Sequence, residues 1–220
     1  GIDGGAFDNC ANLKTVTFEE GTTEIAEGLF AGCTGIEQIR IPDTVTVIES
    51  GAFGGCINLK EITVPDNVTE IQRSAFEYCS SLKTAKLSEN LKSIGIWAFG
   101  DCNVLKSIKI PDSVTDIDGN AFAECKELSD VILSKNLKTM GWQVFGNDNK
   151  LTEIEIPKSL EECRYSVNSA GIDGGAFDNC ANLKTVMFEE GTTEIAEGLF
   201  AGCTGIEQIR IPDTVTVIES

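Results

Sequence analysis

Residues 52–71 read AFGGCINLKEITVPDNVTEI, and this stretch decides the fold because versions of it recur along the whole chain. Phenylalanine recurs every 23 residues from Phe7 to Phe145, and after a break it returns at Phe177 and Phe200. A leucine or isoleucine follows each of these phenylalanines six residues later. A cysteine follows three residues later at all of them except Phe145, where Asp148 stands instead. A fixed period of this length predicts a solenoid of nine stacked coils.

Each coil contains one clear strand signal. After Leu59 the sequence alternates up to Val64, as expected for a strand with one buried face. Proline lacks the N–H group that a strand ladder needs, and all five prolines, including Pro65, directly follow such a stretch. A single coil cannot cover its own inward-facing side chains. The coils must therefore stack, at a strand spacing of about 4.8 Å, to form one continuous core.

The recurring frame A-F-x-x-C-x-x-L-x-x-I-x-I-P-x-x-V-x-x-I resembles the BspA-type leucine-rich repeats of bacterial surface proteins. The resemblance covers the chain except near residues 160–172. It implies a repeat solenoid that coils right-handed, with a parallel sheet on the concave face and short turns or strands on the convex face. Proteins with this repeat are described mainly as adhesion and host- or matrix-binding proteins, so the resemblance implies a cell-surface or secreted location.

The spacing of the repeats suggests one solenoid with an interruption. We expect regular coils over about residues 1–160 and 173–220, and an irregular insertion at about residues 160–172, where nine residues exceed the period. One interpretation of the insertion is a surface bulge between stacked coils. The other is a hinge or docking loop, with Arg164 and Tyr165 as its contact residues.

A long duplication is superimposed on the short repeat. Residues 171–220 repeat residues 1–50 with one difference, Thr17 against Met187. Neither end of the chain has a recognisable polar capping repeat, which solenoids generally need for solubility. We therefore expect the chain to be a fragment of a longer array whose exposed ends can associate end to end.

Charge and composition exclude several classes of function. The net charge of −18 would repel the phosphates of nucleic acid. No apolar run approaches the roughly 18 residues of a membrane span, so we do not expect the chain to be embedded in a membrane. The chain has no histidine, which removes the commonest general base and metal ligand. It also lacks a catalytic triad set and a glycine-rich phosphate loop, so we expect no enzyme activity, no cofactor and no metal site.

The cysteines indicate core packing. Eight of the nine occupy one repeat position, so they stack and point the same way. Parallel Cβ vectors would hold neighbouring Cβ atoms about 4.8 Å apart, against about 3.8 Å in a disulfide. We therefore expect buried free thiols that act as small apolar side chains. A zinc site is disfavoured because the chain has neither a C-x-x-C pair nor a histidine.

The strand positions that point away from the core would line the concave face. These 27 positions hold nine basic and six acidic residues, whereas the rest of the chain is strongly acidic. One interpretation is that the lysines only solvate an exposed strand row. The other is a docking patch for an acidic protein or sulfated glycan. On this second interpretation we predict the ligand-binding residues to be Arg40, Lys60, Lys83, Lys86, Lys106 and Lys109.

Two functions fit these features. The first is a non-enzymatic interaction or adhesion module that binds its partner through the concave strand face. The second is a passive spacer that presents another domain, because near-perfect duplication suits a stalk. Variation of the outward strand positions from coil to coil favours the binding face.

Overall fold

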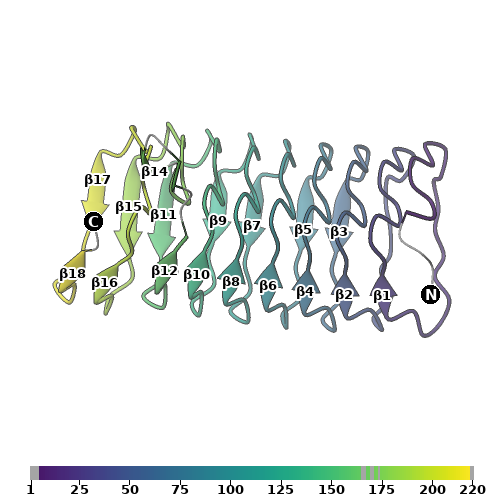
Figure 1. The fold of residues 1–220 in the computed structure, drawn as a ribbon, viewed down its shortest axis with the longest axis horizontal. Helices are drawn as coiled ribbons and strands as arrows, with labels where there is room; N and C mark the ends of the chain where they lie inside the picture. The colour runs from purple at the N-terminus through teal and green to yellow at the C-terminus, as the bar shows by residue number, and fades with distance from the viewer. Residues whose placement is uncertain (1–4, 165–166, 169–170, 173, 219–220) are drawn as a thin grey trace.

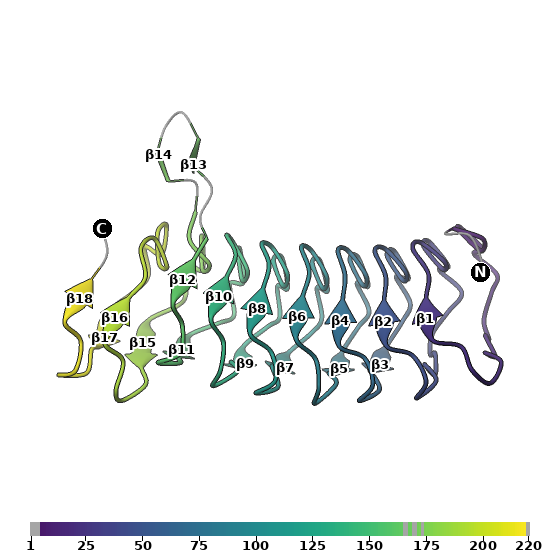
Figure 2. The ribbon, with the colours of Figure 1, turned by 60° about the horizontal axis from the view of Figure 1, so that its bottom comes forward.

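Successive coils of the chain lie side by side in an elongated rod (Figure 1). The structure is a computed structural model that describes residues 5–164, 167–168, 171–172 and 174–218. It confirms the parallel solenoid with a 23-residue repeat, and the described residues form short strands and turns without a helix. The rod runs almost straight in both views, so we call the surface expected to be concave the strand face (Figures 1 and 2).

Two rows of strands run along the rod; the first two coils contribute a strand to the second row only, and each later coil contributes one strand to each row. The strand face contains β3 (Glu61–Thr63), β5 (Thr84–Lys86), β7 (Ser107–Lys109), β9 (Asp130–Ile132), β11 (Glu153–Ile156), β15 (Thr185–Phe188) and β17 (Gln208–Arg210). The second row contains β1 (Glu24–Ile25), β2 (Val47–Ile48), β4 (Glu70–Ile71), β6 (Ser93–Ile94), β8 (Asp116–Ile117), β10 (Thr139–Met140), β12 (Glu162–Cys163), β16 (Glu194–Ile195) and β18 (Val217–Ile218).

The register of pairing equals the repeat, so equivalent residues stack on one another. Ile48 pairs with Ile71, which pairs with Ile94 in the next coil. In the second row, the strands from β1 to β12 form one unbroken seven-stranded parallel sheet. The strand face is interrupted: β3 pairs with β5, β7 with β9, and β11 with β15 and β17. Neighbouring strands β5 and β7 therefore lie beside each other without forming a ladder.

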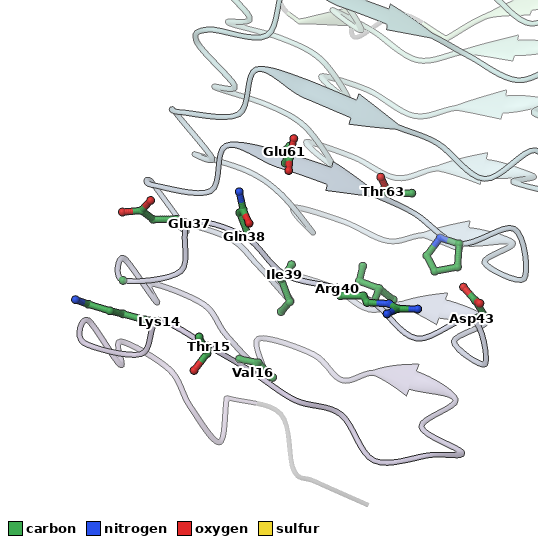
Figure 3. Close-up of a pocket in the computed structure, with 13 residues that line it drawn as sticks. Lys14, Thr15, Val16, Glu37, Gln38, Ile39, Arg40, Asp43, Glu61 and Thr63 are labelled. Atoms are coloured by element: carbon green, nitrogen blue, oxygen red, sulfur yellow. The ribbon is translucent and has the colours of Figure 1, made fainter.

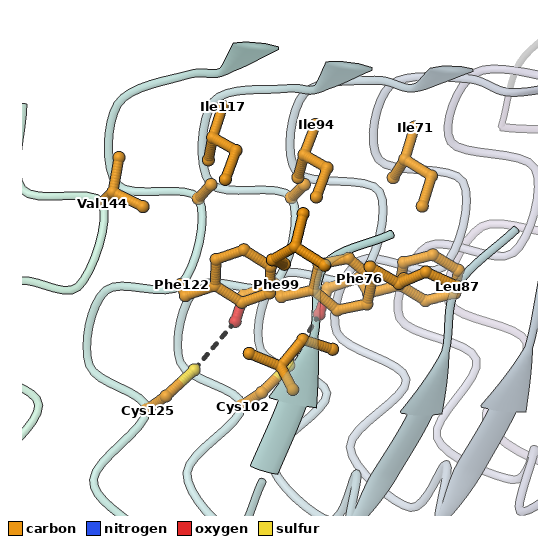
Figure 4. Packing of buried hydrophobic residues seen from close by; sticks show 14 of the residues in the cluster. Ile71, Phe76, Leu87, Ile94, Phe99, Cys102, Ile117, Phe122, Cys125 and Val144 are labelled. Carbon is orange, nitrogen blue, oxygen red and sulfur yellow. Dashed lines mark hydrogen bonds between the residues drawn. The ribbon is translucent and has the colours of Figure 1, made fainter. Parts of the chain in front are cut away.

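A column of nine stacked phenylalanine rings runs along the rod, and Figure 4 shows Phe76, Phe99 and Phe122 from this column. Neighbouring rings stack with their centroids 5.1 to 5.7 Å apart and their planes within 17° of parallel. Phe99, in the middle of the column, is 0% exposed. Offset stacking of this kind adds to the burial energy of each ring. The rings from Phe30 to Phe177 are buried, whereas Phe7 is 42% exposed, and the stacking continues across the step from Phe145 to Phe177.

The turn around each phenylalanine contains two residues in left-handed backbone conformation, which the sequence pattern did not reveal. They stand two residues before and two residues after the ring, except that at Phe177 the first of them is Gly174, three residues before the ring. Most are glycine or asparagine, but Tyr78 (φ 59°) and Trp97 (φ 58°) also adopt this conformation. In the first seven coils, the N–H groups of these two residues and of the phenylalanine donate to carbonyl oxygens of the next coil. Phe53, for example, donates to Ala75 over 2.8 Å. The turn therefore forms a further hydrogen-bond ladder along the rod.

The extra residues of the insertion leave the rod as a small hairpin. Its strands β13 (Val167–Asn168) and β14 (Gly171–Ile172) pair antiparallel and project from the side of the rod (Figure 2). Arg164, at the base of the hairpin, forms ion pairs with Asp118 (3.5 Å) and Glu162 (3.6 Å). Tyr165, the other expected contact residue, lies outside the described residues. The stacking of coils continues past this projection.

The two copies of the duplicated sequence differ on the strand face. In the second copy, β15 and β17 pair with each other and with β11. The equivalent residues 15–18 and 38–40 of the first copy form no strand. The two copies differ here both in the coils beside them and in the one substituted residue, Met187, which lies within β15 where the first copy has Thr17.

Candidate functional site

The strand face presents its side chains in columns that run along the rod. In β3 and β7 the central residues, Ile62 and Ile108, are buried, and the residues on either side of them point outward and are exposed. Equivalent outward residues of adjacent coils are neighbours, because each strand is offset from the last by one repeat. The face is therefore a two-dimensional grid, with a spacing of about 4.8 Å along the rod and about 3.3 Å per residue across it.

Four lysines lie on two neighbouring strands of this grid, and we call Lys83, Lys86, Lys106 and Lys109 the lysine quartet. Lys83 directly precedes β5, and Lys86 is the last residue of that strand. In the next coil, Lys106 directly precedes β7, and Lys109 is its last residue. All four are exposed. The structure thus brings together four of the six residues predicted from the sequence.

Most of the quartet is available to a partner. Lys109 lies 4.0 Å from a carboxylate oxygen of Glu89, a contact between two largely exposed side chains. Such surface pairs contribute about 0–1 kcal/mol and are easily exchanged. Among the described residues, no acidic side chain forms an ion pair with Lys83, Lys86 or Lys106. The positive charges of these three lysines therefore receive little compensation from ion pairs within the described part of the chain.

The other two predicted residues have different surroundings. The ammonium group of Lys60 forms an ion pair with Glu37 in the preceding coil. The hydrogen bond from Lys60 and its positive charge lower the pKa of the exposed Glu37 carboxyl. Arg40 lies outside the quartet, at a groove over the first three coils. Sequence alone could not assign the Lys60 pair, because the rotamers of two long side chains decide it.

The groove at Arg40 has a volume of about 850 Å³. It has Lys14 and Glu37 at one end and Arg40 and Asp43 at the other (Figure 3). Its charges are mixed, so it does not favour an anion in the way that the quartet does. This groove lies where residues 38–40 fail to form a strand, a feature that the repeat pattern could not predict.

A smaller groove lies at the lysine quartet itself. Its volume is about 350 Å³, and it is lined by residues of β3, β5 and β7 and of the turns that follow them. Lys86 and Lys109 line it, together with the hydroxyl-bearing Thr84 and Ser107 and the carboxylates of Glu61 and Glu89. The central residue of β5, Ala85, is only half-buried here, because β5 and β7 do not pair. The lining of the groove is therefore mixed in charge, and the excess of positive charge at this site comes from Lys83 and Lys106, which lie outside the lining.

Comparison with known proteins agrees with this architecture. The family model of the BspA type leucine rich repeat region matches residues 1–104, 46–171 and 159–220 in six copies. The chain belongs to the BspA-type leucine-rich repeat family. A search of curated proteins found no match.

Three solved structures illustrate the likeness. A leucine-rich repeat protein from Bacteroides ovatus is 30% identical, with a TM-score of 0.75, over 97% of this chain and 58% of that one. A leucine rich cell surface protein from Faecalibacterium prausnitzii is 28% identical, with a TM-score of 0.55, over 96% of this chain and 62% of that one. The pneumococcal vaccine antigen PcpA, 21% identical over 88% of this chain and 57% of that one with a TM-score of 0.52, shares the fold. The chain thus spans about three-fifths of the length of the first two.

The cysteines of this BspA-type chain are free thiols. Those from Cys33 to Cys125, together with Cys163 and Cys180, are buried, whereas Cys10 is exposed and is an exception to the expected burial. No described coil precedes Cys10 to cover it. Burial raises the pKa of Cys56 to about 12, because a thiolate would lose its hydration. The buried thiols are therefore neutral at physiological pH and unsuited to nucleophilic chemistry.

Other chemistry finds little support in the described residues. They contain no group of three or more cysteine, aspartate or glutamate side chains placed to hold a metal ion. Nor does any described segment form a helix of the length and apolarity needed to cross a membrane. The BspA-type fold is of a generally non-enzymatic kind.

Proposed function

We propose that this chain is a non-enzymatic interaction module of a bacterial cell-surface or secreted protein, and that it binds an acidic partner through the strand face. The lysine quartet carries the proposal, because it places four exposed lysines on two neighbouring strands, and among the described residues only Lys109 has an ion-pair partner, Glu89. Clustered positive charge speeds association with an acidic partner and selects against basic ones. The similar protein from Faecalibacterium prausnitzii is described as a leucine rich cell surface protein, which supports the proposed location.

The wider charge distribution also supports an acidic partner at this face. The whole chain has a net charge of −18, so an anionic ligand is repelled over most of the surface. Attraction is therefore concentrated at the quartet. Because a surface lysine–carboxylate contact contributes only about 0.2–1 kcal/mol, binding at one site is weak and gains strength through repetition.

The test is binding of the chain to a panel of matrix proteins and sulfated glycans at low and physiological salt. We expect saturable binding that weakens as salt is added and falls at least about tenfold when all four quartet lysines are changed to glutamate. The matched control changes Lys92, Lys126, Lys135 and Lys138 to glutamate. These four are exposed and lie off the strand face, so the control has the same net charge as the test variant. Equal losses in the two variants would reject the quartet as the site.

A passive spacer is the second candidate, favoured by the near-identity of residues 1–50 and 171–220. In a spacer, length matters more than the identity of exposed side chains. Absence of binding to every member of the panel at both salt concentrations would favour this alternative.

A further inference from the structure

The chemistry of the strand face changes in a definite order along the rod beyond the quartet. One outward column contains Lys86, Lys109, Ile132 and Glu155 in four successive coils. Lys109 pairs in register with Ile132, and β9 lies next to β11, which carries Glu155. All four side chains are exposed. The column therefore runs from basic through apolar to acidic.

Ile132 differs from the other outward residues near the quartet. Its side chain is 54% exposed, and it occupies a position that is polar in the coils on both sides. Single exposed apolar residues are common on protein surfaces. Ile132, however, lies between Lys109 and Glu155. An apolar side chain of a ligand bound over Ile132 would therefore have a basic residue of this chain on one side and an acidic residue on the other.

The basic region is short, and carboxylates flank it on both sides. Glu61 lies in β3 before the quartet, and Asp130, Glu153 and Glu155 lie in β9 and β11 after it. Coils are spaced by about 4.8 Å, and charge is felt over a Debye length of about 8 Å at physiological salt. A uniformly anionic chain lying along the rod would therefore meet repulsion within one or two coils of the lysines. A ligand of mixed charge avoids it.

We propose that the strand face binds an extended peptide segment that carries an acidic residue, an apolar residue two positions on and a basic residue two positions further. This inference rests on the proposed function and specifies the partner. The acidic side chain lies between Lys86 and Lys109, the apolar one over Ile132 and the basic one at Glu155.

The spacing of an extended peptide matches this arrangement. Its side chains project on one side at every second residue, about 6.6 Å apart. The midpoint of Lys86 and Lys109 lies one and a half coils from Ile132, or about 7 Å, and two and a half coils from Glu155, or about 12 Å. Two and four peptide residues span about 6.6 and 13 Å. The three side chains therefore reach their sites without distortion of the peptide.

The test uses three immobilised ligands at equal density: peptides containing Glu-Ser-Leu-Ser-Lys or Glu-Ser-Glu-Ser-Glu between flexible linkers, and a heparin-derived oligosaccharide. We expect the wild-type chain to bind the mixed peptide at least about fivefold more tightly than the uniformly acidic one. A variant with Glu153→Lys and Glu155→Lys is expected to reverse that preference. The Ile132→Ser variant should bind the mixed peptide about three- to tenfold more weakly. The matched control is Ile57→Ser, since Ile57 is 42% exposed and lies off the strand face.

The outcomes separate this inference from the proposed function. If heparin or the uniformly acidic peptide binds at least as tightly as the mixed peptide, and the quartet variant loses that binding, the mixed-charge peptide is rejected while the basic docking site stands. If none of the three ligands binds, the inference is overturned, and the panel of matrix proteins decides the function separately. Reversal of preference in the Glu153 and Glu155 variant supports the inference directly.

Discussion

The thiol of Cys125 donates a hydrogen bond to the carbonyl oxygen of Phe99, which lies 3.3 Å away in the preceding coil (Figure 4). The same contact recurs from Cys33 to Cys203 wherever the column contains cysteine. Asp148 occupies this column between Cys125 and Cys180. Its side chain is fully buried, and neither carboxyl oxygen has a hydrogen-bond partner. An ionised carboxylate cannot donate a hydrogen bond, so the column accommodates aspartate best in its protonated form.

Replacement of Asp148 by cysteine, the residue of the other coils, is expected to stabilise the rod. Burial raises the pKa of the Asp148 carboxyl well above its usual value; the nearby backbone of Cys125 opposes part of this rise, and the negative charge of Glu124 adds to it. The Asp148→Cys variant removes a buried polar group that lacks a partner, so its free energy of unfolding should rise by about 1–3 kcal/mol at pH 8. Urea unfolding followed by circular dichroism measures the change.

The same substitution should alter the dependence of stability on pH. The folded state retains the Asp148 proton to a higher pH than the unfolded state, whose carboxyl titrates near pH 3.9. The contribution of the protonated carboxyl is therefore complete below about pH 3.9 and is lost as pH rises towards the folded-state pKa. The advantage of Asp148→Cys should be smaller at pH 4 than at pH 8. An equal advantage at both values would show that Asp148 is ionised in the fold.

The central rings of the phenylalanine column should contribute much more to stability than the first. Phe99 is fully buried, with ring centroids 5.1 Å from Phe76 and 5.3 Å from Phe122. Phe99→Ala is expected to lower the free energy of unfolding by about 3–5 kcal/mol, because it removes a large buried side chain and leaves a cavity. Phe7 is 42% exposed, so Phe7→Ala should cost much less. Similar losses in the two variants would contradict the continuous column.

The fold was predictable because its main determinants repeat. The spacing of Phe53, Cys56 and Leu59 specifies which residues face inward, and stacking of identical coils then fixes the rest of the core. The lysine quartet followed from the same register. The ion pair between Lys60 and Glu37 did not, because it depends on side-chain rotamers, and the unpaired edges of β5 and β7 depend on small displacements between coils. The 23-residue repeat of the sequence does not predict either of these two features.

Chemical labelling should distinguish Cys10 from the buried thiols. Cys10 is exposed, whereas Cys102 is fully buried and burial raises its pKa well above the usual value. With iodoacetamide at pH 8, mass spectrometry should therefore find Cys10 labelled in the folded protein and Cys102 protected. All nine cysteines should react in urea. Labelling of folded Cys102 at the rate of Cys10 would contradict the buried column.

The left-handed turn residues provide the last prediction. Tyr78 has a φ of 59° and a side chain that is 55% exposed, so its conformation carries strain with little compensating burial. The left-handed conformation costs about 1–2 kcal/mol for most L-residues, although glycine loses more entropy on folding. Tyr78→Gly should therefore raise the free energy of unfolding by about 0.5–1 kcal/mol.

The reciprocal control is Gly55→Ala, at the equivalent position of the preceding coil with a φ of 72°. It should destabilise by a similar amount, because the added Cβ would meet the nearest atoms of Gly32 at an ordinary 3.5 Å and only the backbone conformation is penalised. Changes of the same sign in both variants would show that contacts of the tyrosine ring, and not the left-handed turn, determine stability at this position.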